Sequence, residues 1–97
     1  MTPYSWIITA DHLNEKTDSY YRVGMEGPFG TEHDWKANPD AGQPFQMFDD
    51  DGTLYYEGRY VGDDSEDLFG PLEDMGTPDA GCTGIKYPNA EGKMEFI

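Results

Sequence analysis

The chain has little positive charge, one cysteine and no long apolar segment. Its 97 residues contain 6 Lys and Arg against 20 Asp and Glu, which gives a formal net charge of −14. Direct binding to nucleic acid or to an anionic membrane would therefore meet like-charge repulsion. No run approaches the roughly 18 apolar residues of a membrane span, and no basic-then-apolar stretch predicts a signal peptide. We expect one soluble cytoplasmic domain over residues 1–97.

The sequence also lacks the motifs that catalysis uses. It contains no glycine-rich phosphate loop, no nucleophile elbow and no Cys–His pair with a family spacing. With 20 acids, chance pairs of carboxylates are inevitable and predict no acid–base chemistry. Cys82 has no internal disulfide partner, and its glycine and threonine neighbours predict a buried, inert thiol. We expect no enzyme and no cofactor.

Aromatic residues supply the apolar surface that an acidic composition otherwise lacks. High net charge favours disorder, because too little apolar surface is buried to offset chain entropy. The chain nevertheless has 2 Trp, 7 Tyr and 5 Phe, and each ring can bury roughly 150 to 250 Å². We therefore expect a folded domain with a thin aromatic core.

Apolar residues alternate with polar ones in the first quarter of the chain, which is typical of β-strands. Tyr4, Trp6 and Ile8 define one face of a predicted strand over residues 3–10. A polar loop over residues 11–18 and a second strand over 19–25 should follow. Thr31 and Asp34 resemble a capping box and predict a helix of about two turns over residues 31–38, ending before Pro39.

The strongest local signal is a hairpin over residues 43–61. Asp51 and Gly52 predict a two-residue type I′ turn, and pairing Asp50 with Thr53 sets Met47 opposite Tyr56 and Phe45 opposite Gly58. The predicted inner face consists of Phe45, Met47, Leu54, Tyr56 and Tyr60. The predicted outer face consists of Gln46, Phe48, Asp50, Thr53, Tyr55, Glu57 and Arg59.

A second hairpin is predicted from residues 83–87 and 93–97. The stretch between the two hairpins should be irregular, with one helical turn over residues 64–69, because glycines and prolines break helices. Those breakers are Gly70, Pro71, Gly76, Pro78 and Gly81. These patterns predict an α+β fold, a mostly antiparallel sheet of about six short strands with one short helix.

The acids are concentrated in the middle of the chain. Residues 49–74 hold ten of the 20 acids and a single base, Arg59, so this segment carries −9 of the −14 charge. The ten acids are the predicted partner-binding residues: Asp49, Asp50, Asp51, Glu57, Asp63, Asp64, Glu66, Asp67, Glu73 and Asp74. In extended chain, carboxylates two residues apart lie about 6.6 to 6.8 Å from each other. That spacing permits imitation of the phosphates of a nucleic-acid strand.

In size, acidity and strand pattern the chain resembles the small phage- or plasmid-encoded inhibitors that mimic nucleic acid, including anti-CRISPR and antirestriction proteins. The resemblance rests on residues 48–52 and the acids of residues 63–67, while Lys86 and Lys93 depart from an all-acidic surface. It implies a non-catalytic protein that blocks the basic groove of a defence nuclease or CRISPR surveillance complex in a bacterial host cell.

Cation binding is an alternative interpretation of the acids. An EF-hand register with Gly52 at position 6 places Met47 at position 1 and Gly58 at position 12, where a bidentate Glu is required, so this motif fails. A looser calcium site from Asp63, Asp64 and Asp67 stays open. Cys82, His12 and His33 have no zinc-ligand spacing.

Two further interpretations need no nucleic-acid-binding target. A salt-adapted protein would spread its acids evenly over the surface, and an accessory phage protein could dock a basic host surface of another kind. Aromatic residues near the acids, such as Phe48 and Tyr55, would add apolar anchors to any such contact. A homodimer related by a two-fold axis would double the acidic surface.

Overall fold

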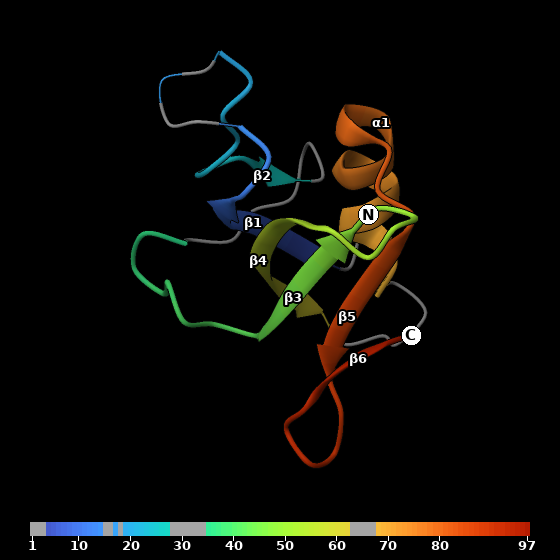
Figure 1. Ribbon diagram of the computed structural model, residues 1–97. Coiled ribbons are helices and arrows are strands. Elements are labelled where there is room, and N and C mark those ends of the chain that lie inside the picture. Colours follow the sequence, from blue (N-terminus) through green and yellow to red (C-terminus); the bar gives the residue numbers. More distant parts are fainter. Residues whose placement is uncertain (1–3, 15–16, 18, 28–34, 63–67) are drawn as a thin grey trace.

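The computed structural model describes residues 4–14, 17, 19–27, 35–62 and 68–97. These form one antiparallel sheet with strand order β2-β1-β4-β3-β5-β6 and a helix against one face (Figure 1). The strands are β1 (Tyr4–Asp11), β2 (Glu26–Gly27), β3 (Gln43–Phe48), β4 (Leu54–Gly62), β5 (Gly84–Pro88) and β6 (Met94–Phe96). The predicted fold class, a mostly antiparallel α+β protein with about six short strands, is confirmed.

Strand β1 confirms the first predicted strand. Trp6 and Ile8 are buried on the face that meets the helix, which we call the inner face, whereas Thr9 of the same strand is exposed. On the opposite, outer face, Ser5 is covered by Trp35, whose Nε1 donates a hydrogen bond of 3.2 Å to Ser5 Oγ. Alternating side chains thus bury both faces of β1 near its start.

The central hairpin has the predicted register over most of its length. Met47 lies opposite Tyr56, and Phe45 lies opposite Gly58. Glycine is required at position 58, because a Cβ there would collide with the carbonyl oxygen of Ile7 and lie 2.5 Å from the Phe45 ring. Gly58 therefore lets the Phe45 ring lie against the middle of the sheet.

The predicted type I′ turn is wrong. Among the described residues only glycines have positive φ, so Asp51 does not adopt the left-handed conformation that such a turn requires, and Gly52 alone does, at +80°. Gly52 N–H donates to Asp49 O over 3.2 Å, and Asp49 N–H donates to Thr53 O over 3.1 Å. The observed turn is therefore longer than the predicted two-residue turn, and its left-handed residue is the glycine that follows Asp49, Asp50 and Asp51.

The longer turn also changes which side chains face inward. Phe48 pairs with Leu54, so a β-bulge places Tyr55 between the Leu54 and Tyr56 pairings. Tyr55 packs against the inner core, although the alternation predicts it on the outer face, and Leu54 does not join that core. One extra residue in the strand reverses the two assignments.

The predicted strand over residues 19–25 is wrong, since strand pairing is confined to Glu26–Gly27. Gly24 has φ +92° and donates to Ile8 O, while Arg22 N–H donates to a carboxylate oxygen of Asp11. These bonds hold the segment in turns, and Tyr20 is left 63% exposed. Alternation of apolar residues predicts a strand, but the backbone donors are taken by other partners.

The helix lies in the stretch that the breakers predict to be irregular. A π-helical segment, η2 (Leu72–Gly76), continues directly into α1 (Thr77–Ala80). Pro78 lies near the start of α1 and follows η2 without a break, so the helix continues through a residue that has no backbone N–H to donate. Gly76 allows close packing, since a Cβ there would lie 2.6 Å from Met47 Sδ. Gly81, with φ +72°, ends the helix.

Two other helix predictions fall mainly outside the described residues. Of the predicted helix over 31–38, positions 31–34 lie outside, and Trp35 to Ala37 form a turn. Of the predicted helical turn over 64–69, positions 64–67 lie outside, and the described Leu68 and Phe69 are in a turn that leads into the helix.

The core between sheet and helix is rich in aromatic residues. Its largest fully buried side chains include Trp6, Tyr56, Tyr60 and Phe45. Rings touch edge to face where Tyr60 meets Tyr87, with centroids 5.7 Å apart. The predicted aromatic core is thus formed by inner-face residues of four strands, closed by Leu72 and Met75 of the helix.

The C-terminal hairpin of β5 and β6 confirms the second predicted hairpin. Its turn is closed by Asn89, whose N–H donates to Lys93 O and whose carbonyl accepts from Gly92 N–H. No helix in the described part of the chain has the length and apolar character needed to cross a membrane.

Replacing Gly58 with alanine should lower the free energy of unfolding by about 3 kcal/mol, because the new methyl group overpacks a backbone oxygen and a core ring. Gly52→Ala is the matched control, since it has open space around it and only its positive φ is unfavourable, at about 1 to 2 kcal/mol. Urea unfolding of both variants measures the difference. Equal losses would contradict the packing role of Gly58.

Candidate functional site

The predicted acidic site is divided among three places and a segment outside the described residues. Asp63, Asp64, Glu66 and Asp67 belong to that outside segment. Of the other six acids, Asp49, Asp50 and Asp51 lie in the β3–β4 turn, Glu57 lies in mid-strand on the outer face, and Glu73 and Asp74 lie in η2. We call residues 49–52 the acidic turn.

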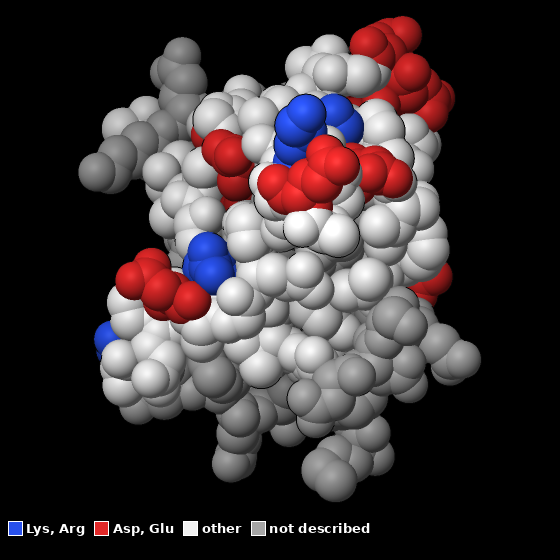
Figure 2. Space-filling model, turned by 90° about the horizontal axis from the view of Figure 1, so that it is seen from below, with Lys and Arg blue, Asp and Glu red and all other residues white. Residues whose placement is uncertain are grey.

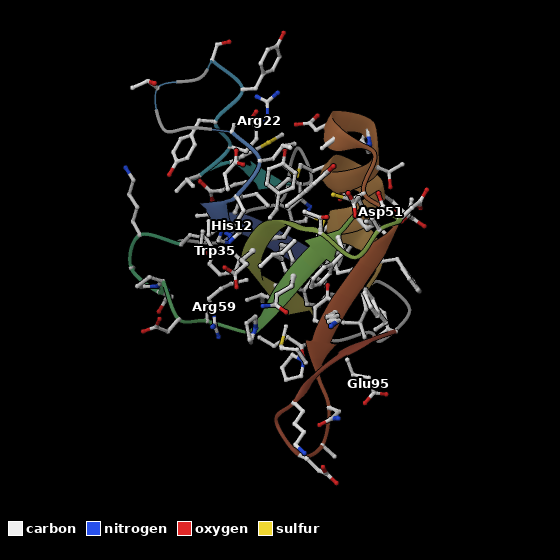
Figure 3. The ribbon with its side chains drawn as sticks, in the orientation of Figure 1. His12, Arg22, Trp35, Asp51, Arg59 and Glu95 are labelled. Carbon is white, nitrogen blue, oxygen red and sulfur yellow. The ribbon has the colours of Figure 1, made fainter. Side chains whose placement is uncertain are left out.

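The acidic turn is held by one of its own carboxylates. Asp49 Oδ1 accepts hydrogen bonds from the backbone N–H groups of Asp51 (2.9 Å) and Thr53 (2.8 Å). The side chains of Asp50 and Asp51 make no ion pair with any described residue, and both residues are exposed. Figure 3 shows Asp51 beside the helix, away from Arg22 and Arg59. Two free carboxylates therefore project from a fixed turn.

Asp49 itself stays ionised. The hydrogen bond from Thr53 N–H, which is the largest cause, lowers the pKa of its carboxyl below the ordinary value, with further bonds from Tyr55 and Asp51 acting against partial desolvation. The same contact with Asp49 raises the pKa of the Tyr55 hydroxyl. Asp49 thus keeps its negative charge at neutral pH.

The β3–β4 turn and the β5–β6 turn share one backbone design. In the C-terminal turn, Asn89 Oδ1 accepts from the N–H groups of Glu91 (2.9 Å) and Lys93 (3.1 Å), as Asp49 Oδ1 does from residues two and four positions later. Gly92 and Gly52 both have φ +80°. The sequence Asn-Ala-Glu-Gly therefore builds the same turn with fewer charges, and it provides a template for removing charge from the acidic turn.

The helix acids have different roles. Asp74 Oδ2 accepts hydrogen bonds from Tyr4 OH (2.8 Å) and from Trp6 Nε1 (3.0 Å), so it joins η2 to β1. Glu73 is exposed and makes no ion pair with the residues that the structure describes. Of these two predicted site residues, Asp74 thus has a clear structural role and Glu73 is free for contact with a partner.

Glu57 is engaged on the outer face of the sheet. Its Oε2 lies 2.8 Å from His12 Nε2, and its Oε1 accepts a bond of 3.1 Å from Gln46 Nε2. The bond with His12 is the main cause that lowers the pKa of Glu57, with Gln46 adding to it against partial burial. Both carboxylate oxygens of Glu57 have partners within the protein, so this side chain has little capacity to bind another protein.

Asp11 is an acid that the sequence pattern gave no reason to single out, and it organises the following loop. Its two oxygens accept bonds from Leu13 N–H, Asn14 N–H, Asn14 Nδ2 and Arg22 N–H. Partial burial acts to raise the pKa of Asp11, but these hydrogen bonds together outweigh it and lower the pKa. The position directly after a strand and before polar residues is the signal that could have indicated this loop-closing role.

The bases do little to neutralise the acids. Arg22 Nε pairs with Asp79 over 2.9 Å. Arg59, the lone base of the acidic segment, donates instead to the backbone carbonyls of Asp40, Ala41 and Gly42 over 2.8 to 3.0 Å. Arg59 therefore makes no ion pair with any acid of this segment that the structure describes.

The described acids do not form one continuous stripe on the face shown in Figure 2. Acidic atoms there form several groups separated by uncharged surface, and basic atoms adjoin two of these groups. The acidic turn does adjoin the end of the helix, because Thr83 N–H donates to Phe48 O over 2.8 Å and Cys82 N–H donates to Gly76 O. The acidic turn therefore lies near the C-terminal end of α1, whereas Asp74, which is bonded to Tyr4 and Trp6, lies toward the opposite end of the sheet.

The metal and thiol hypotheses gain no candidate from the described residues, which contain no group of three or more His, Cys, Asp or Glu arranged to hold an ion. Asp63, Asp64, Asp67 and His33 lie outside them. Cys82 is fully buried, and burial raises the pKa of its thiol to about 11, so it is a neutral thiol at pH 7.

No family model, curated protein or solved structure matches this chain. A functional argument therefore has to come from the chain's own surface.

Replacing Asp74 with alanine should lower the free energy of unfolding by about 1 to 3 kcal/mol, since the buried indole N–H of Trp6 would lose its acceptor. Asp74→Asn retains an acceptor oxygen and should recover most of that loss. Glu73→Ala, one position earlier and exposed, should change stability by less than about 0.5 kcal/mol. Thermal and urea unfolding measure all three. Equal effects of the alanine variants would contradict the role of Asp74.

Stability should fall as the solution becomes acidic. The pKa values of Asp11, Asp49 and Glu57 are lowered in the folded state, so their contribution is complete above the ordinary values of 3.8 and 4.5 and is lost as pH falls through the lower folded values. Asp11→Asn should be less stable than the parent protein at pH 7, and the difference should shrink at pH 3. Urea unfolding at both pH values measures this. A difference that is independent of pH would contradict it.

Proposed function

We propose that this protein is a non-catalytic inhibitor that occupies the basic nucleic-acid-binding groove of a defence nuclease or CRISPR surveillance complex in a bacterial host cell. Carboxylates take the place of backbone phosphates, and Lys and Arg side chains of the groove pair with them. The observation that carries the proposal is the acidic turn, where Asp49 fixes the backbone and leaves Asp50 and Asp51 exposed without a basic partner in the described structure.

Rigidity of the turn supports this function. A turn already held in one conformation loses little further entropy when it binds, so more of the electrostatic attraction appears as affinity. The net charge of −14 adds long-range attraction to a cationic groove and raises the association rate. We expect Glu73 and the acids of residues 63–67 to be further carboxylates that contact the groove.

A second candidate is an acid-rich domain adapted to high salt that has no nucleic-acid-related target. The separation of the acidic groups in Figure 2 favours it, because an adaptation to the solvent distributes charge over many faces. The two candidates differ in their response to local changes of charge. Inhibition depends on particular carboxylates, whereas salt adaptation depends on the total charge.

The decisive measurement is displacement of duplex DNA from basic nucleic-acid-binding complexes, with the protein as competitor. Replacing the acidic turn by the Asn-Ala-Glu-Gly sequence of the other turn, through D49N, D50A and D51E, removes two charges and keeps the turn geometry. We expect this variant to compete about tenfold or more weakly and to show a smaller dependence on salt.

The matched control removes two charges from exposed positions elsewhere, through Glu26→Gln and Glu91→Gln. It should compete nearly as well as the parent protein. Charge reversal of Asp63, Asp64, Glu66 and Asp67 to lysine tests the remainder of the predicted site in the same assay. Equal competition by the turn variant and the control would contradict a role of the acidic turn, and no displacement by any form would favour the second candidate.

A further inference from the structure

The ammonium group of Lys86 rests on two aromatic rings. Its Nζ lies 4.8 Å from the centroid of Phe48 and 4.7 Å from the centroid of Phe96, within the range of cation–π attraction. The two ion pairs among the described residues do not involve Lys86. The chain has 20 acids, yet within the described structure this cation is bound by π-faces and by no carboxylate.

The two rings come from the strands on either side of β5. Phe48 ends β3 and Phe96 ends β6, and their rings meet edge to face with centroids 5.2 Å apart and planes at 68°. Gly84 of β5 lies opposite Phe48, and a Cβ at Gly84 would lie 2.7 Å from the Phe96 ring. The glycine thus makes room for the ring pair, which we call the aromatic cradle.

The aromatic cradle is accessible and next to negative charge. Phe96 belongs to the edge strand and is 51% exposed, so displacement of Lys86 would uncover ring faces at the surface. Phe48 directly precedes Asp49 in the chain, which places the cradle at the base of the acidic turn. Nearby carboxylates raise the local concentration of cations around the rings.

We propose that the aromatic cradle binds an arginine side chain of a basic protein partner, and that Lys86 occupies it in the free protein. The proposal rests on the proposed function in assuming a cationic partner, and it identifies the side chain recognised. A guanidinium group is planar, stacks on aromatic faces and is more weakly hydrated than an ammonium group. An incoming arginine therefore competes successfully with Lys86, whose ammonium returns to water.

The exchange adds specificity to an otherwise electrostatic contact. At long range the carboxylates of the acidic turn attract lysine and arginine alike, since both carry one positive charge. The aromatic cradle discriminates between them, because only arginine gains from stacking its plane on the rings. A partner groove rich in arginine is thus preferred over one equally rich in lysine.

The test compares two labelled peptides of equal charge, nona-arginine and nona-lysine, by fluorescence anisotropy with the whole protein. The ratio of the two affinities cancels the electrostatic contribution that both peptides share. We expect nona-arginine to bind more tightly than nona-lysine. The rings should shift the ε-methylene NMR signals of Lys86 upfield in the free protein, and these signals should move toward ordinary values as nona-arginine is added.

Three variants make the test specific. Phe96→Leu keeps an apolar, half-exposed side chain and should bring the ratio of affinities close to one. Lys86→Met empties the cradle of its own cation and should strengthen nona-arginine binding by about two- to fivefold more than nona-lysine binding. Lys93→Met, in the exposed turn, loses the same charge and should leave the ratio unchanged. A ratio that Phe96→Leu does not change would overturn the proposal.

Failure of this proposal can be distinguished from failure of the proposed function. The turn variant D49N/D50A/D51E should weaken both peptides by a similar factor and leave their ratio as in the parent protein. If the protein displaces DNA but shows no preference for arginine, the role of the aromatic cradle is contradicted and the proposed inhibitor function is supported. If the protein prefers nona-arginine through Phe96 but displaces no DNA, the role of the aromatic cradle is supported and the proposed target is contradicted.

Discussion

The structure depends on hydrogen bonds that carboxylates accept from groups other than bases. With 20 acids and 6 bases, ion pairing cannot satisfy most of the carboxylates. Asp11 closes a loop with backbone donors, Asp49 closes a turn in the same way, and Asp74 accepts from a tyrosine and a tryptophan. Such charge-assisted bonds are stronger than neutral ones. In this acidic chain, some of the excess carboxylates therefore stabilise the fold by accepting hydrogen bonds.

That use divides the acids into two groups. Carboxylates with internal donors have fixed positions and little left to offer, as with Glu57 between His12 and Gln46. Carboxylates with no donor among the described residues, such as those of Asp50 and Asp51, lie on a turn that the first group holds. A protein that binds a cationic groove needs both groups, because the exposed charges act at defined distances only if their backbone is fixed.

Several features could be predicted because they depend on neighbouring residues. Alternation in β1 and the pairing of Met47 with Tyr56 follow from side chains that must bury on one face of a sheet. The position of the helix did not follow from local preference. Gly76 breaks helices in isolation, yet here it lets the helix approach Met47, and the packing outweighs the propensity. Residues 19–25 show the converse, since bonds to Ile8 and Asp11 override an alternating pattern.

The sequence by itself determined the general character of the protein, namely an acidic chain with one sheet, an aromatic core and an Asp-rich turn. It did so because charge, alternation and turn residues are local properties. Tertiary structure alone decided three contacts. Asp74 accepts a hydrogen bond from Trp6, Arg59 donates to the backbone carbonyl of Ala41, and Lys86 rests on Phe48 and Phe96. These partners are far apart in the chain, and only strand pairing and helix packing bring their atoms within bonding distance.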